Sequence, residues 1–386
     1  MITTAHWRGR CALMVAHCAG MVDLVALPVW IGALIQHYAF DPQQAGMLAT
    51  LFLVGAVAAS IALAPRFHRL PARTIATAGF ALAAIAFAVA ARRTGFAELA
   101  LLHASAGLCV GAALSVTHGT IACSGRPHRL FAITGAALGV FAVLFLGTTP
   151  SLVASSGGPA LFQVFAAVMA VAAVAALLAF PRPENRPATG DAAQPGSPIP
   201  PAVWAGIIGI ACMGLLQAMT FSFLERVGHD RGFGLQAITG VLIALGLVNL
   251  LPAPLAGLLE GRLPVRRVLL TGPVLQGLLA SVIMTSSGFV PYAAAASVFA
   301  AVMIFTHTFA FGLLARLDPS GRALAATPAM VMTGAALGPV LGGTLVKNFG
   351  YASLAAAAAC IALIAVACFM RVKDPSPAAF RHATGI

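Results

Sequence analysis

The stretches Arg69-Leu-Pro-Ala-Arg73 and Arg262-Leu-Pro-Val-Arg266 lie 193 residues apart in a chain of 386 residues, so the offset between them is half of the chain length. Further pairs of identical residues share this offset, namely Phe40 and Phe233, Gln43 and Gln236, and Gly79 and Gly272. A constant offset between matching residues is typical of an internal repeat. The sequence therefore predicts two copies of one structural unit.

The composition indicates that this unit is surrounded by lipid. Hydrophobic residues make up 60% of the chain and charged residues 8%, and the mean hydropathy is +0.96. A soluble protein with so few charges could not cover its surface with polar groups. Apolar stretches of roughly 20 residues, separated by short breaks, are typical of membrane-spanning helices. We expect twelve of them, at 11–38, 43–65, 74–92, 97–122, 128–155, 159–181, 201–228, 235–260, 266–288, 290–315, 322–347 and 350–371.

The positions of the basic residues indicate how these helices are oriented. If the N-terminus is cytoplasmic, the cytoplasmic segments contain 17 of the 22 basic residues. This distribution follows the positive-inside rule and predicts a multi-pass protein of the inner membrane with both termini in the cytoplasm. The net charge of +12 then reflects topology and attraction to membrane lipids, and we expect no nucleic-acid binding. The outer side keeps Arg92, Arg93, Arg226, Arg231 and Lys347.

Two copies in the same orientation each need an even number of helices, which gives six helices per copy. The sequence thus predicts an all-α integral membrane fold in which two six-helix halves are related by a pseudo-two-fold axis. The N-terminal half spans residues 1–181 and the C-terminal half spans residues 201–386. Residues 182–200 contain several Pro and Gly residues and no helical periodicity, so we expect a cytoplasmic linker there.

The repeated arginine stretches are predicted to lie in equivalent cytoplasmic loops. Around them the chain reads Ala64-x-x-x-His68-Arg69-x-Pro71-Ala72-Arg73 and Gly257-x-x-x-Gly261-Arg262-x-Pro264-Val265-Arg266. These loops resemble the signature Gly-x-x-x-Asp-Arg-x-Gly-Arg-Lys/Arg of the major facilitator superfamily, and the resemblance extends over essentially the full length of the chain. It implies a gate that includes Arg69, Arg73, Arg262 and Arg266. Because His68 and Gly261 replace the family's loop aspartate, the alternative is that these arginines serve topology alone.

A second repeated pattern is Gly135-Ala-Ala-Leu-Gly139 and Gly334-Ala-Ala-Leu-Gly338, the latter followed by Pro339. Small residues at four-residue spacing let membrane helices approach closely, so we expect these five residues to pack helices together. Drug antiporters of the resembled family carry Gly-x-x-x-Gly-Pro in the fifth helix. Val140 stands at the place of that proline, so the antiporter form is absent from this helix.

Few ionisable residues are predicted within the membrane, where each is costly unless it is paired or faces water. Asp23 lies about 11 residues into the span 11–38, close to the bilayer midplane. Gln217 occupies nearly the same place in the other half, so we expect it to face Asp23 across a cargo site between the halves. Trp30 shares a helix face with Asp23 and is predicted to stack on the cargo. The alternative for Asp23 is a protonated acid that bonds to a neighbouring helix.

Four histidines, His17, His103, His118 and His307, are predicted within helices. The stretch His103-Ala-Ser-Ala-Gly107 stands where the family often has Arg-x-x-x-Gly, which is linked to proton coupling in its antiporters. An imidazole with an ordinary pKa of about 6.5 can change its charge where an arginine cannot, so we expect His103 to carry the coupled proton. Gly107 is expected to pack helices, and His307 to contact cargo or protons. Haem ligation is disfavoured because His103 and His118 lie at different depths.

Glu225 and Arg226 lie near the outer end of the span 201–228, followed by His229, Asp230 and Arg231. We expect Glu225 and Arg226 to form an outer gate, with a solvated rim as the alternative. Asn249 and Gln276 are further candidates for contact with cargo, although single amides often link helices. The seven cysteines lack metal-ligand spacing, so no metal site is expected.

The chain lacks the common nucleotide-binding, metalloprotease and hydrolase motifs, so we expect no enzyme activity, no cofactor and an ion gradient as the energy source. The favoured interpretation is a monomeric secondary active transporter that moves a small organic solute by alternating access, coupled to protons. Efflux is favoured over uptake, because an acid beside an aromatic residue suits an amphipathic compound. The alternatives are uptake of an organic acid held by His103 and His307, and a transporter-like membrane sensor.

Overall fold

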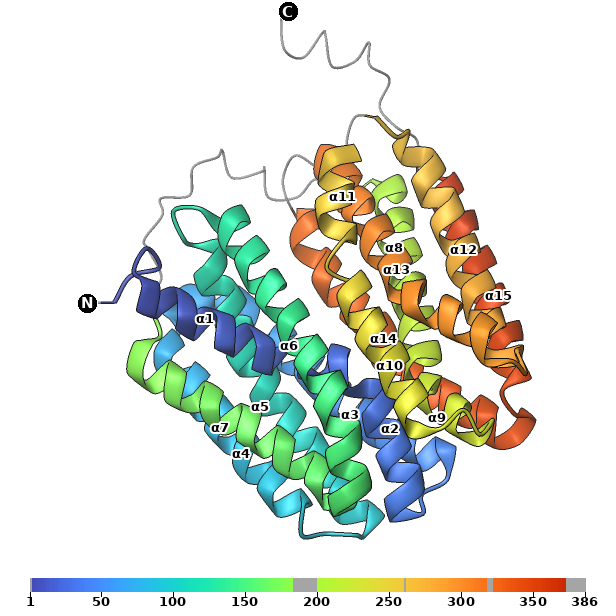
Figure 1. Cartoon of the computed structure of the whole chain (residues 1–386). Coiled ribbons are helices and arrows are strands. Elements are labelled where there is room, and N and C mark those ends of the chain that lie inside the picture. The colour runs from blue at the N-terminus through green and yellow to red at the C-terminus, as the bar shows by residue number, and fades with distance from the viewer. Residues whose placement is uncertain (1, 183–199, 260–261, 318–321, 373–386) are drawn as a thin grey trace, which may run out of the picture.

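The computed structural model describes residues 2–182, 200–259, 262–317 and 322–372, and it is built from helices (Figure 1). The expected linker at 182–200 lies almost entirely outside these ranges. The helices are α1 (Trp7–Gly20), α2 (Val22–Tyr38), α3 (Pro42–Leu63), the 3₁₀ helix η1 (Ala64–Arg69), α4 (Ala72–Ala90), α5 (Phe96–Ala122), α6 (Pro127–Ser156), α7 (Pro159–Ala179), α8 (Pro201–Ser222), α9 (Leu224–Asp230), α10 (Leu235–Val248), α11 (Pro252–Leu259), α12 (Val265–Thr285), α13 (Phe289–Leu317), α14 (Arg322–Phe349) and α15 (Ala352–Met370).

These helices make twelve membrane crossings, as the hydropathy pattern predicts. The pairs α1–α2, α8–α9 and α10–α11 each form one interrupted crossing. Eleven crossings in the described part of the chain are long and apolar enough by composition to span a membrane, and α14, with 28 residues, is the twelfth. The predicted spans differ from the observed helices by a few residues at their ends, in both directions: α1 and α13 extend beyond the predicted span, whereas α7 and α12 end before it.

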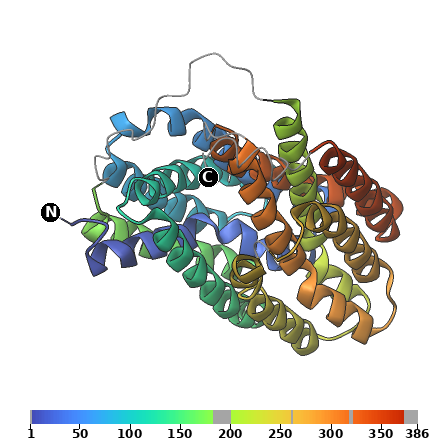
Figure 2. The ribbon, with the colours of Figure 1, turned by 90° about the horizontal axis from the view of Figure 1, so that it is seen from above.

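The two six-helix halves have matching internal packing (Figures 1 and 2). In the N-terminal half α4 packs against α5 and α7, and in the C-terminal half α12 packs against α13 and α15. These are the third, fourth and sixth crossings of each half, so the repeat seen in the sequence is a repeat of packing as well. The all-α fold with two related halves is confirmed, whereas the exact residue boundaries of the halves stay a prediction.

An even number of crossings places the start of α1 and the end of α15 on the same side of the membrane, which we call the terminus side. The opposite side is called the distal side. Two helix pairs join the halves, α3 with α14 and α6 with α10, and α2 also contacts α8 and α9. The distal side carries the connections at 39–41, 91–95, 157–158, 231–234, 286–288 and 350–351.

The α3–α14 contact is a close approach of two backbones. A Cβ added to Gly46 would overlap the carbonyl of Pro339, and a Cβ added to Gly343 would overlap the carbonyl of Pro42. The Thr50 hydroxyl accepts a hydrogen bond of 3.2 Å from the backbone N–H of Val340. Because these positions lie in the first turns of α3 and the last turns of α14, the contact closes the distal side.

The α6–α10 contact is made of apolar side chains. An added Cβ would overlap the Leu250 side chain at Gly139 and would lie 3.4 Å from Ile243 at Gly147. A Cβ added to Gly246 would lie 3.1 Å from the Val143 side chain. The contact runs from the middle of α6 towards its distal end, so both helix pairs hold the halves together in the distal part of the membrane.

The other motif glycines differ in their surroundings. Gly107 faces the backbone of Phe52, Gly334 faces the carbonyl of Ala211, and Gly338 faces the backbone of Met219. Each of these contacts joins two helices of the same half. At Gly135 an added Cβ would meet no atom within 4 Å, so this glycine lacks the close helix contact that the repeated motif predicts.

We expect Gly46→Ala to destabilise the protein and Gly135→Ala not to. The added methyl group at position 46 would push α3 away from α14, and overpacking of this kind costs about 1–3 kcal/mol. At position 135 there is free space, and alanine favours a helix over glycine by roughly 0.5–1 kcal/mol. Thermal unfolding of the purified variants in detergent measures both effects. Equal melting temperatures for the two variants would contradict this account of the α3–α14 contact.

Candidate functional site between the two halves

The first crossing of each half is interrupted where it approaches the other half. Met21 separates α1 from α2 with φ −110° and ψ 19°, and Phe223 separates α8 from α9 with φ −108° and ψ 5°. Both residues leave the helical conformation, so each crossing consists of two helical segments. The segments α2 and α9, beyond the breaks, contact each other across the two halves. The breaks thus frame the candidate site.

Asp23 lies two residues beyond the first break, about half-way along the 32-residue crossing from Trp7 to Tyr38. Its side chain is buried, with 3% of its surface exposed. The first turn of a helix carries backbone N–H groups without helical partners, and the helix dipole there favours a negative charge. The break therefore places a carboxyl group at a favourable position deep in the membrane.

Gln217 is held within its own half. The Nε2 group of Gln276 on α12 donates a hydrogen bond of 2.9 Å to the Oε1 atom of Gln217, and it also lies 3.4 Å from the Met213 carbonyl. Gln276 is fully buried, so this amide pair links α12 to α8. The expectation that Gln217 faces Asp23 and contacts cargo stays a prediction.

Trp30 and His103 form a buried hydrogen-bonded chain. The Trp30 Nε1–H donates to His103 Nε2 at 3.3 Å, and His103 Nδ1–H donates to the Leu99 carbonyl at 2.6 Å. Neither side chain has exposed surface, and this pattern fixes His103 as the Nδ1–H tautomer. Both rings are thus core residues of the N-terminal half, so stacking of Trp30 on cargo and titration of His103 stay predictions. The rings that surround them belong to Phe52, Phe87, Phe162 and Phe165.

The remaining membrane histidines also have partners. His307 Nδ1 donates to the Met303 carbonyl at 2.9 Å, and its ring centroid lies 4.9 Å from that of Phe311. His17 and His118 share a hydrogen bond of 3.0 Å between ring nitrogens, which joins α1 to α5. The sequence does not predict this contact, because nothing in the spacing of 101 residues indicates that His17 and His118 meet. The expected contact of His307 with cargo stays a prediction.

Glu225 and Arg226 point to different partners. Arg226 forms an ion pair of 2.8 Å with Asp230, whose other oxygen accepts a hydrogen bond of 2.6 Å from the Tyr351 hydroxyl. Glu225 instead lies against Gly32 of α2, where an added Cβ would overlap its carboxylate. With 9% of its surface exposed, Glu225 is not part of a solvated rim.

The loop arginines lie on the terminus side. Arg69, Arg73, Arg262 and Arg266 are all exposed, and Arg73 also donates a hydrogen bond to the Leu177 carbonyl in the last turn of α7. A guanidinium group there satisfies a free carbonyl and complements the helix dipole. Arg73 thus binds within the N-terminal half, and a gating role of the four arginines stays a prediction. Gly261, which replaces the family aspartate in the second loop, lies outside the described residues.

An ion pair that the sequence does not predict joins the two halves. The Lys347 Nζ atom lies 2.9 Å from Asp41 Oδ2 and 3.3 Å from Gln43 Oε1. Asp41 also caps α3, because its carboxylate accepts from the Gln44 N–H at 2.9 Å while Gln44 Oε1 accepts from the Asp41 N–H at 3.2 Å. This capping box is readable in the sequence, but the partner Lys347, 306 residues away, is not.

The electrostatics of Asp41 favour its ionised form. Partial burial acts to raise the pKa of this carboxyl group, but hydrogen bonds from the Gln44 N–H and the Lys347 ammonium group outweigh it. The pKa of Asp41 therefore lies below its usual range. Asp41 therefore stays ionised throughout the neutral pH range, and its ion pair with Lys347 joins α3 to α14 at the distal end.

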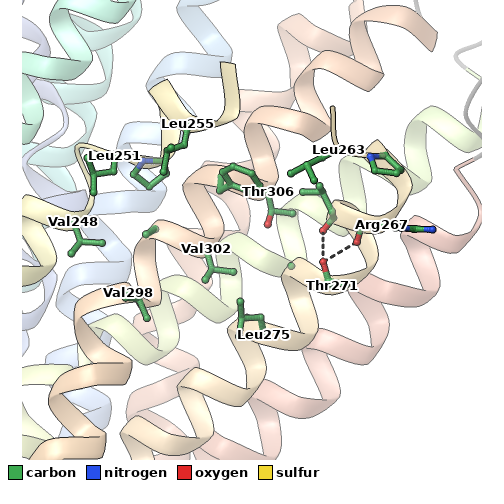
Figure 3. Close-up of a pocket in the computed structure, with 16 residues that line it drawn as sticks. Val248, Leu251, Leu255, Leu263, Arg267, Thr271, Leu275, Val298, Val302 and Thr306 are labelled. Atoms are coloured by element: carbon green, nitrogen blue, oxygen red, sulfur yellow. Dashed lines mark hydrogen bonds between the residues drawn. The ribbon is translucent and has the colours of Figure 1, made fainter. Parts of the chain in front are cut away.

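An apolar groove lies in the C-terminal half (Figure 3). It has a volume of about 500 Å³ and runs between the α10–α11 crossing, α12 and α13. Leucine and valine side chains line it, among them Leu251, Leu255, Leu275, Val298 and Val302. Four of these side chains are large and exposed, as expected for a surface that faces lipid acyl chains, namely Leu251, Leu255, Leu275 and Val298.

Comparisons with known proteins agree on the fold. The family model of the Major Facilitator Superfamily matches residues 12–317. A bacterial homolog of the human lysosomal transporter Spinster, in its inward-facing and unoccupied conformation, is 14% identical with a TM-score of 0.67, over 94% of each chain. Its inward-facing, occupied form is 13% identical with a TM-score of 0.70, over 94% of this chain and 93% of that one.

The nucleoside transporter NupG is 14% identical with a TM-score of 0.73, over 94% of this chain and 98% of NupG. No curated protein matches the sequence. At these identities the solved structures show a shared fold only, whereas the family model covers most of the chain and carries the assignment. The chain belongs to the major facilitator superfamily.

Proposed function

We propose that this protein is a secondary active transporter that moves a small organic solute by alternating access, coupled to protons, with efflux favoured over uptake. The observation that carries the proposal is the arrangement of two related halves around the interrupted first crossings, with Asp23 buried next to one break. Two rigid halves that share a limited contact are suited to rocking about a central site. On this proposal the protein is not an enzyme.

The conformational state of the structure can be assigned from the side of the membrane that is closed. The terminus side carries most of the arginines and is proposed to be the cytoplasmic side of an inner membrane. Because the α3–α14 contact and the Asp41–Lys347 ion pair close the distal side, we assign the structure to an inward-facing state. The Spinster homolog with a similar fold is described in inward-facing conformations, with and without an occupant.

Efflux of an amphipathic solute is retained over uptake of an organic acid. The uptake interpretation needs His103 and His307 as partners of the anion, but both nitrogens of His103 are engaged inside the N-terminal half. Asp23 is the buried acid near the middle of the membrane, and a carboxylate suits a solute that carries an amine or hydrogen-bond donors. Asp23 is therefore the residue proposed to bind cargo or the coupled proton.

We expect Asp23→Asn to abolish proton-driven transport while the protein still folds. The amide has nearly the same shape as the carboxyl group but does not exchange a proton. Flux into proteoliposomes under an imposed pH gradient is the measurement, after a thermal-shift screen of amines, carboxylates and aromatic compounds has supplied a cargo. Glu98→Gln, a change at an exposed carboxylate paired with Arg93, serves as the control. Proton-driven flux at the wild-type rate in Asp23→Asn would remove Asp23 from the mechanism.

We expect Lys347→Gln to favour opening of the distal side. Loss of an exposed ion pair changes the free energy by about 0–1 kcal/mol, so the distal-open population should rise by up to about fivefold. The exchange Asp41→Lys with Lys347→Asp should restore part of the closure, although it loses the α3 cap. Accessibility of a cysteine at Thr50 to a membrane-impermeant reagent reports the opening.

The same ion pair has a defined pH dependence. Because the pKa of Asp41 is lowered in the closed state, its contribution is complete above the ordinary aspartate pKa of about 4 and is lost as the pH falls through the lowered pKa. The effect of Lys347→Gln should therefore be constant across the neutral range. An effect that varies between about pH 6 and 8 would show that another group titrates at this contact.

A further inference from the structure

Glu225 is a buried acid that forms no ion pair with any of the described residues. It stands in the first turn of α9, directly after the break at Phe223. Its Oε2 atom is buried and has no hydrogen-bond partner among the described residues. An ionised carboxylate in such a place is strongly unfavourable, whereas the protonated acid is neutral and far less costly to bury. The site is thus built for the neutral form.

The carboxyl group lies at the contact between the two halves. It covers Gly32 of α2, and an added Cβ there would overlap Oε2. Gly32 is itself buried, so the acid fills the space that a side chain on α2 would otherwise occupy. Because α2 and α9 belong to different halves, this burial exists only while the distal side is closed.

The cations near Glu225 are engaged elsewhere. Arg226 pairs with Asp230, and the Arg231 guanidinium group donates to the carbonyls of Ile283 and Met284 at 2.7 and 2.5 Å. The neighbouring Tyr292 of α13 donates its hydroxyl to the Leu224 carbonyl at 2.8 Å. None of these described groups donates a hydrogen bond to the Glu225 carboxylate.

Other titratable groups stand on the helices packed against α9. His37 lies on α2, five residues beyond Gly32, and is exposed. Asp23 lies nine residues before Gly32 on the same helix, about 13 Å away along the axis. His307 and Arg316 on α13 and Arg266 and Arg267 on α12 lie towards the terminus side. Tyr351, which follows α14, binds Asp230.

We propose that Glu225 is a proton-binding site that must be occupied for the distal side to close. In the distal-open state the carboxylate faces water and takes up a proton, which forms an O–H bond. The neutral acid can then be buried against Gly32. Opening exposes the group again and lets the proton leave to the distal solution. The proposal rests on the alternating access proposed above and adds a second acid, at a different depth from Asp23.

This site explains how pH would control the distal contact. The pKa of Asp41 lies below its usual range, so this carboxylate does not titrate at neutral pH. The α6–α10 contact consists of apolar groups around Gly139, Gly147 and Gly246 and cannot titrate. On this proposal, the group that titrates at the distal contact is Glu225, the buried acid between α2 and α9. Closure should therefore be favoured at low pH and opposed at high pH.

The test measures opening of the distal side without cargo. A cysteine at Thr50, buried in the α3–α14 contact, is introduced into the full chain after the native cysteines are replaced. Its labelling by a membrane-impermeant maleimide is followed between about pH 5 and 9. The labelling rate of Thr50→Cys is divided by that of Thr94→Cys, which lies in an exposed distal loop. This labelling ratio is free of the pH dependence of the thiol reaction itself.

The wild-type ratio should rise with pH, by up to about tenfold per pH unit where Glu225 titrates. Glu225→Gln, which is always neutral, should keep the ratio low at every pH. Gly32→Ala should raise it, because its Cβ displaces the acid, and this variant also tests the proposal if Glu225→Gln folds poorly. Glu98→Gln should behave like the wild type.

A wild-type ratio that does not change with pH would overturn the proposal, as would a Glu225→Gln variant with the wild-type pH profile. Loss of the pH response in His37→Gln or in Asp23→Asn, with Glu225 intact, would place the proton at that residue instead and also overturn it. The labelling experiment requires no transport, so its outcome is independent of the flux measurements on Asp23→Asn.

Discussion

The close approach of α3 and α14 is the constraint on which the paired halves depend. Lipid tails are as apolar as the helices, so the hydrophobic effect does not drive the halves together, and direct contact between well-packed surfaces must do so. Gly46 and Gly343 allow backbone atoms of one helix to touch the carbonyls of Pro339 and Pro42. A side chain at either glycine would push α3 and α14 apart. Because α2 and α9 belong to the same two halves, their contact would then be disrupted as well.

Buried polar groups in this protein differ in whether they have a hydrogen-bond partner. Most hydroxyls bond to a carbonyl of their own helix, as Thr117, Thr120 and Ser222 do with residues four positions earlier. Such bonds satisfy the group locally and need no function to explain them. Seven buried side-chain atoms have no hydrogen-bond partner among the described residues, and the Oε2 atom of Glu225 is the one that belongs to a carboxyl group. Within the membrane, the absence of a local partner is therefore more informative than polarity itself.

The twelve crossings could be predicted from the sequence because hydropathy records the solvent around each segment. The breaks at Met21 and Phe223 could not, since both residues are ordinary apolar residues in apolar surroundings. The identical motifs at Gly135 and Gly334 likewise show that the sequence alone does not determine whether another helix packs against a glycine. Both permit close approach, but only Gly334 has a helix backbone next to it. Likewise the order Glu225-Arg226 in the chain does not reveal that Arg226 pairs with Asp230. Partners are decided by the tertiary arrangement.

The contacts between the halves are asymmetric although the halves are related. The α3–α14 and α6–α10 pairs are equivalent under the repeat, yet among the described residues only the former ends in an ion pair, Asp41 with Lys347. Its side chains are 34% and 41% exposed, so water replaces most of the interaction when it breaks, and it adds little strength. Its directional geometry instead fixes how α3 and α14 align. The α6–α10 contact brings apolar side chains together around Gly139, Gly147 and Gly246, so under the proposed alternating access we expect the two pairs to move by different amounts.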